Sequence, residues 1–180
     1  VAPNTNQSAL ASWHNEKSTC AEADVVSVTT DATTDLTILA GTRLGGTVTS
    51  GHGAVASGNL YFYASCQDYE DGRSAGSAWF GGAYSKTLAP GSYRVWIEVY
   101  DDSGALSSWN GGSATCAGST AITVADATDT EPLTAKTGVI LSGTVTSGKG
   151  PVADGTVRFY ADCAAYEDRD QVGYGAIDAG

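Results

Sequence analysis

The sequence lacks the features that define several classes of protein. It contains no run of about 18 apolar residues, so it predicts no helix inserted in a membrane. Basic residues are few: nine stand against twenty acidic ones, which gives a net charge of −11. An acidic surface repels nucleic acid and anionic membranes, so we expect neither as a partner.

Histidine is scarce, which limits the chemistry available. His14 and His52 are the only two, and neither belongs to a recognisable Ser-His-Asp or Cys-His arrangement. Gly-rich phosphate-binding loops are missing too. Neighbouring carboxylates lie in Gly-rich turns, without the apolar pocket that a glycosidase acid requires. We therefore predict a protein that is not an enzyme and that needs no cofactor.

The four cysteines, at positions 20, 66, 116 and 163, include no close pair of the kind that zinc sites use. Acidic clusters at 68–71 and 166–170 lack the spacing of a calcium loop, so we interpret them as solvated loops and expect no metal site. Widely spaced cysteines in such a sequence are typical of disulfides in secreted proteins. We therefore expect an extracellular or cell-surface location.

What the sequence does contain is the pattern of a β protein. Between 92 and 100, apolar and polar residues alternate with a period of two, which predicts a half-buried strand. Other strands are expected at 44–49, 59–65, 77–84, 119–124 and 133–146, separated by Gly, Pro and Asp turns. No apolar pattern of period 3.6 predicts a substantial helix. About seven short strands in a module of about 97 residues indicate a β-sandwich.

An internal repeat divides the chain into modules. The hexapeptide Gly-Thr-Val-Thr-Ser-Gly at 46–51 returns 97 positions later, at 143–148. A second pairing, offset by 96, relates Trp13 to Trp109. One complete module therefore spans 41–137, with the C-terminal part of a module before it (1–40) and the N-terminal part of another after it (138–180). A chain that begins and ends within a module is expected to join something else.

The module resembles a known family. Residues 46–58, the Phe-Tyr pair at 62–63 and the segment 88–95 resemble a prealbumin-like sandwich, and 109–124 is similar to its closing strands. Relatives are the carboxypeptidase regulatory-like domains and the collagen-adhesin B-type repeats of bacterial surface proteins. The resemblance implies all-β, Ig-like sandwich modules that serve as spacers, stalks, adhesins or pilins. The first strand, 44–49, lacks the lysine of an adhesin isopeptide bond, so none is expected.

Cysteine positions within the repeat suggest two bridges. Cys66 and Cys116 are the only cysteines of the complete module, so the simplest arrangement is a disulfide between them; the alternative is two buried free thiols. A bridge across such a loop can add roughly 4 kcal/mol. Cys20 corresponds to Cys116, and Cys163 corresponds to Cys66. We therefore predict that Cys20 and Cys163 bond between neighbouring subunits.

These observations favour a structural subunit of an extracellular filament, pilus or stalk, joined head to tail to copies of itself by strand complementation. The counterpart of the thirteen residues 84–96 occurs in neither end piece, so a simple joint would be short of one strong strand.

Alternatives remain at this point. The chain could be a fragment of a longer repeat protein, an accessory part of a secreted enzyme, or a chain whose two ends close on each other. It could also be an adhesin module that binds a surface glycan or protein through five aromatic residues. They are Tyr61, Trp96, Tyr100, Trp109 and Trp13.

Overall fold

The computed structural model describes residues 9–17, 19–30, 33–101, 103–125 and 129–178. They fall into two compact units, Val1–Val139 and Ile140–Gly180, which are treated separately below. Strands dominate and form several mostly antiparallel sheets, so the prediction of a β protein is confirmed at this level. Among the described residues, no helix has the length and apolar character needed to cross a membrane.

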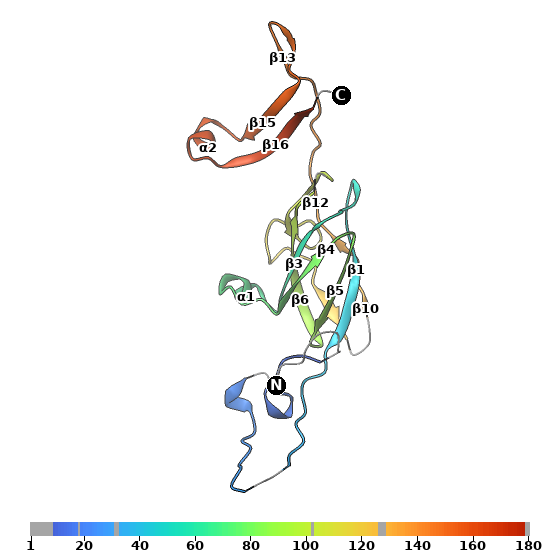
Figure 1. Ribbon diagram of the computed structural model, residues 1–180, viewed down its shortest axis with the longest axis vertical. Coiled ribbons are helices and arrows are strands. Elements are labelled where there is room, and N and C mark those ends of the chain that lie inside the picture. Colours follow the sequence, from blue (N-terminus) through green and yellow to red (C-terminus); the bar gives the residue numbers. More distant parts are fainter. Residues whose placement is uncertain (1–8, 18, 31–32, 102, 126–128, 179–180) are drawn as a thin grey trace. The chain divides into compact units, whose positions relative to one another are not determined.

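The first sheet of the first unit is built around β1 (Thr42–Ser50). This strand pairs antiparallel with β2 (Gly53–Ala54) and β5 (Ala83–Leu88). It pairs parallel with β10 (Asp129–Thr130) and β11 (Leu133–Thr134). Figure 1 shows β1 beside β5 and β10. The C-terminal strands of the module, β10 and β11, therefore return to pair with its first strand, β1.

The second sheet is antiparallel throughout. Its order is β4 (Gly76–Phe80), β3 (Gly58–Tyr63), β6 (Gly91–Val99) and β8 (Ser108–Trp109), and β9 (Ile122–Val124) also pairs with β6. A separate short pair joins β7 (Ala105–Leu106) to β12 (Lys136–Thr137). The helix α1 (Cys66–Glu70) follows β3. This sheet therefore holds the strand predicted most clearly from the sequence, β6, at its centre.

One apolar core is shared by the two sheets. Alternation places Leu60 and Phe62 of β3 and Val95 and Ile97 of β6 inside it, and Leu44 of β1 enters from the other sheet; all five are fully buried. Burying a side chain of this size contributes about 1.5–3 kcal/mol. The central module thus has a core of its own.

Two strand predictions need correction. The segment 77–84, expected as one strand, forms β4 and β5, which belong to different sheets. The chain turns between them at Gly82, whose φ of +87° suits a glycine. The segment 133–146, expected to be extended throughout, contains β11 and β12 and then no strand from 138 to 145.

The first unit also includes residues 9–40, which correspond to the end of a module. Two 3-10 turns lie here, η1 (His14–Glu16) and η2 (Cys20–Glu22). In the described part of this segment, β pairing is limited to the bridges Ala9↔Ala40 and Trp13↔Lys17. Its local turns therefore form without the sheets seen in the central module.

The second unit repeats the opening hairpin of the module. It contains β13 (Thr146–Ser147), β14 (Gly150–Pro151), β15 (Asp154–Tyr160), α2 (Cys163–Glu167) and β16 (Gln171–Asp178). In the β15–β16 ladder Phe159 lies opposite Gly173, just as Phe62 lies opposite Gly76 in the β3–β4 ladder. The offset of 97 found in the sequence thus holds in the strand register.

Candidate functional site

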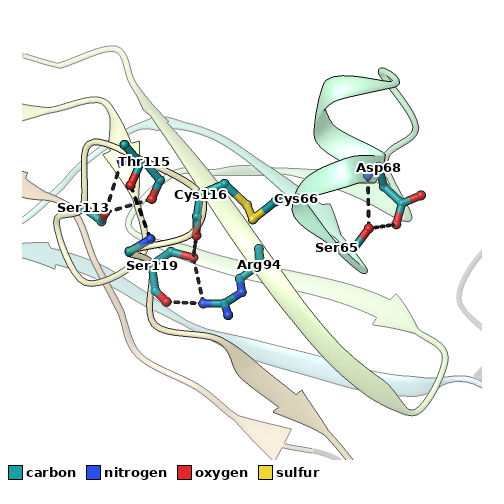
Figure 2. The surroundings of a disulfide bond; sticks show 9 residues. Ser65, Cys66, Asp68, Arg94, Ser113, Thr115, Cys116 and Ser119 are labelled. Atoms are coloured by element: carbon teal, nitrogen blue, oxygen red, sulfur yellow. Dashed lines mark hydrogen bonds between the residues drawn. A yellow bond between two sulfur atoms is a disulfide. The ribbon is translucent and has the colours of Figure 1, made fainter.

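The structure joins Cys66 to Cys116, with their Cα atoms 5.7 Å apart. Cys66 is the first residue of α1, and Ser65 caps that helix by accepting a hydrogen bond from the Asp68 N–H at 3.1 Å. Cys116 lies in the loop that follows β8. Figure 2 shows the bridge reaching from this loop to the start of the helix. The bond therefore ties the far end of β3 to the closing part of the module.

The loop of Cys116 is held by hydrogen bonds to its carbonyl oxygen. Ser119 donates to this oxygen from its backbone N–H at 3.0 Å and from its hydroxyl at 2.7 Å. Arg94 of β6 donates in turn to the Ser119 carbonyl oxygen, and to the Ser119 hydroxyl at 3.2 Å (Figure 2). These bonds fix the loop against β6 and hold Cys116 opposite its partner.

The acidic cluster at 68–71, interpreted as a loop, instead forms the end of α1 and the turn after it. Asp68 accepts a hydrogen bond from the Ser65 hydroxyl, which lowers the pKa of its carboxyl, and the nearby Arg73 guanidinium adds to this effect. Arg73 contacts Asp68 at 3.2 Å and Asp71 at 2.6 Å. In the part of the chain that the structure describes, no three His, Cys, Asp or Glu side chains are grouped to hold a metal ion.

Both remaining cysteines are free and exposed, and each has the local structure of its paired counterpart. Cys163 opens α2, which Asp162 caps by accepting from the Ala165 N–H at 2.8 Å, as Ser65 caps α1. Cys20 accepts at its carbonyl oxygen from the Ala23 N–H at 3.2 Å, in the same turn that Cys116 makes. Cys20 and Cys163 thus lie in the same local structures as Cys116 and Cys66, respectively.

The contacts of the closing strands also recur near the N-terminus. The Ser12 hydroxyl accepts from the Leu39 N–H at 2.9 Å, as the Ser108 hydroxyl accepts from the Lys136 N–H at 2.8 Å. The Trp13–Lys17 bridge likewise matches Trp109–Ser113. Residues 9–40 therefore keep the turns of a module's end.

An open apolar groove lies in the second unit, and the larger apolar side chains of its lining have counterparts that the complete module buries. Leu141 is 72% exposed and Phe159 38% exposed, whereas their counterparts Leu44 and Phe62 are 0% exposed. The branched aliphatic and aromatic side chains that line the groove are Leu141, Val145, Val152, Val157, Phe159 and Ile177. Their counterparts, all fully buried in the first unit, are Leu44, Val48, Val55, Leu60, Phe62 and Phe80. The groove is half of a core.

The aromatic residues singled out in the sequence do not form one platform. Trp109 is only 2% exposed, because its ring packs against Tyr69 at 4.9 Å and Trp96 at 5.6 Å between centroids. Trp13 lies apart from them, in the segment 9–40. Tyr61 and Tyr100 are brought together through Glu98. The sequence interpretation missed the most exposed indole of the central module, Trp79 of β4.

Comparison of the chain with protein-family models, with curated proteins and with solved structures finds no match.

Proposed function

We propose that this chain is a structural subunit of an extracellular filament or stalk, built from prealbumin-like β-sandwich modules and joined head to tail to copies of itself. The apolar groove of the second unit carries the proposal. Exposure of an apolar surface to water is unfavourable in free energy. Exposed apolar patches of this kind mark sites of association. In the central module the counterparts of its lining residues share one core with residues of the closing segment, among them Ile122, Val124 and Leu133. We therefore expect the closing segment of another copy to cover the groove.

Residues 33–38 of a second copy are the segment that would cover the groove. In the central module β11 lies parallel to β1, and Val48 pairs with Leu133. The matching hydrogen bonds of Leu39 and Lys136 set the offset at 97 in this part of the repeat, so the same register pairs Val145 of one copy with Leu36 of the next. Both side chains are exposed, and the described residues around them form no strand until 146. Pairing would supply the missing neighbour for both segments.

The same joint would bring Cys163 of one copy to Cys20 of the next, as Cys66 meets Cys116. A disulfide at that point requires an oxidising compartment, which fits an extracellular location. A contact between two different surfaces of identical subunits does not close on itself, so it generates a linear assembly. The expected function is mechanical, with a covalent bridge in each module and at each joint.

The segments named here supply only part of a complete module. No counterpart of β5, or of β6 up to Trp96, occurs at either end of the sequence. In the central module β6 lies between β3 and β8, whereas among the described residues β15 pairs only with β16. The joint therefore rests on the β1–β11 type of pairing and on the disulfide. One edge of β15 is left to accept a further strand.

Assembly can be tested with oxidised protein, by light scattering after size exclusion, electron microscopy and non-reducing gels. We expect filaments, and a ladder of bands that collapses to one band on reduction. Val145→Asp places a charge in the groove and should abolish the assemblies. Val172→Asp is the matched control, because Val172 is 63% exposed and its counterpart, Ala75, is also exposed in the central module.

A monodisperse monomer with two titratable thiols would overturn the proposal. Equal assembly of the Val145→Asp and Val172→Asp variants would also overturn it, because the groove would then have no part in joining.

A further inference from the structure

The face of the β4–β3–β6 sheet that points away from the core carries polar and aromatic side chains. These side chains take no part in packing the core. Since Leu60 of β3 points into the core, its neighbours Asn59 and Tyr61 lie on the opposite face. In register, Asn59 lies between Trp79 of β4 and Glu98 of β6. We call Asn59, Tyr61, Trp79, Glu98 and Tyr100 the outer face.

A hydrogen-bond network fixes the polar groups of the outer face. The hydroxyls of Tyr61 and Tyr100 both donate to Oε2 of Glu98, at 3.2 and 2.7 Å. Asn59 donates from Nδ2 to the Tyr100 hydroxyl oxygen at 3.0 Å. The strands β3 and β6, with Tyr100 directly after β6, thus present a carboxylate, two phenol oxygens and an amide in a set arrangement. Groups of this kind can both donate to and accept from the hydroxyls of a ligand.

Trp79 stands at the border of this network and is 66% exposed. Its six-membered ring lies over Gly81, where an added Cβ would overlap the far edge of the indole. Gly81 has an ordinary negative φ, so backbone conformation does not require a glycine there. The glycine therefore leaves room for the far edge of the indole to lie close to the backbone, while most of this large apolar side chain stays exposed to solvent.

The second unit contains the same hairpin as the central module, so it shows which aromatic and polar residues that hairpin requires. Tyr63 and Tyr69 make an edge-to-face contact at 5.3 Å, and Tyr160 and Tyr166 repeat it at 5.2 Å. The outer face does not recur, although its hairpin has the same register. Asn59, Tyr61, Trp79 and Gly81 are replaced by Thr156, Arg158, Ala176 and Asp178. A module can thus form this hairpin without them, and Trp79 and Gly81 change together.

We propose that the outer face of the central module binds an uncharged carbohydrate chain. An exposed indole offers a flat apolar surface to the C–H face of a sugar ring, and the fixed network beside it offers partners for sugar hydroxyls. Trp79 and Glu98 are separated by two strand spacings, about 10 Å, so the ligand has to extend along the face. Glu98 and the net charge of −11 oppose an anionic polymer.

The test measures binding of the full chain to galactomannan, dextran and hydroxyethyl cellulose by affinity electrophoresis, with polygalacturonate as an anionic comparison. At least one neutral polymer should retard the protein. Trp79→Ala should weaken that binding by about tenfold or more, as loss of an aromatic anchor does elsewhere. Gly81→Ala, which displaces the indole, should weaken it less. Trp13→Ala removes an exposed indole outside this face and should change nothing.

Thermal unfolding of each variant shows whether it is folded, and Trp79 is exposed enough for its loss to be tolerated. Three results would overturn the proposal: no retardation by any neutral polymer, retardation that Trp79→Ala leaves unchanged, or retardation by polygalacturonate alone. Trp79-dependent binding to a protein that carries no glycan, without binding to any polysaccharide, would also overturn it, in favour of a protein partner.

Discussion

At the scale of single residues, Asp101 is the side chain that fixes the turn after β6. Its carboxylate accepts hydrogen bonds from the backbone N–H groups of Ala56, of Ser57 at 3.0 Å and of Ser103 at 3.1 Å. Burial alone would raise its pKa, but these hydrogen bonds outweigh burial and lower the pKa. One carboxylate therefore links the loop before β3 to the turn that β6 enters.

A lowered pKa in the folded state means that Asp101 stabilises the fold above its unfolded pKa of about 3.9 and that this contribution is lost as the pH falls further. Asp101→Asn should cost about 1 kcal/mol at neutral pH, because the charged acceptor is lost. The difference in unfolding free energy between wild type and variant should shrink as the pH falls from about 5 to about 3. Denaturant melts across this range measure it. Asp154→Asn, at an exposed position, is the control, and a difference independent of pH would contradict the expectation.

Single residues also show where the sequence was sufficient. Alternation in 92–100 predicted which side chains of β6 enter the core, because a period of two is a local property. The sequence did not predict that Trp109 is buried, because the aromatic rings that cover it come from three other elements, β3, α1 and β6. Trp79 was overlooked because glycines interrupt its segment; the signal available was Ala176 at the equivalent position.

At the scale of elements, α1 is five residues long, too short for a helical period to be visible. The sign of it in the sequence was Ser65 three residues before Asp68, a capping pattern. The segment 77–84 was mistaken for one strand because a change of sheet at Gly82 leaves no mark on the apolar pattern. The repeat did indicate which cysteines belong to one module, since that inference needs only their order in the chain.

The disulfide joins two such elements, α1 and the loop after β8, across 50 residues. Cys66→Ser together with Cys116→Ser should lower the free energy of unfolding by about 2–5 kcal/mol, because the unfolded chain regains the freedom of that loop. Chemical denaturation under non-reducing conditions measures this. In the unassembled monomer, where Cys20 is an exposed free thiol, Cys20→Ser should change it by less than about 0.5 kcal/mol. Equal stability of the double variant and wild type would show that the bridge does not constrain the unfolded chain.

At the scale of the whole molecule, the glycines of the repeated hexapeptide bear on how chains join. A Cβ at Gly46 would overlap the carbonyl oxygen of Glu131, so the parallel approach of β10 to β1 requires glycine there. Gly45 has more room, with its nearest neighbour at 3.4 Å, and the repeat replaces it by Ser142. Gly143 is retained at the position of Gly46, although no atom of the described chain would lie within 4 Å of a Cβ there. A strand from a partner copy that approaches Gly143 as closely as β10 approaches Gly46 would require a glycine at this position.

Gly143→Ala should therefore leave the unfolding of the isolated chain unchanged but weaken assembly by about tenfold or more, since overpacking at a close backbone contact costs about 1–3 kcal/mol. Ser142→Ala, one residue earlier, is the matched control and should assemble like wild type. Light scattering over a dilution series measures both, with Cys20 and Cys163 replaced by serine so that covalent bonds do not hide the difference. Equal assembly of the two variants would mean that residues 141–146 do not pair with a neighbouring copy in the way that β1 pairs with β10 and β11. The groove would then have to be covered in another register.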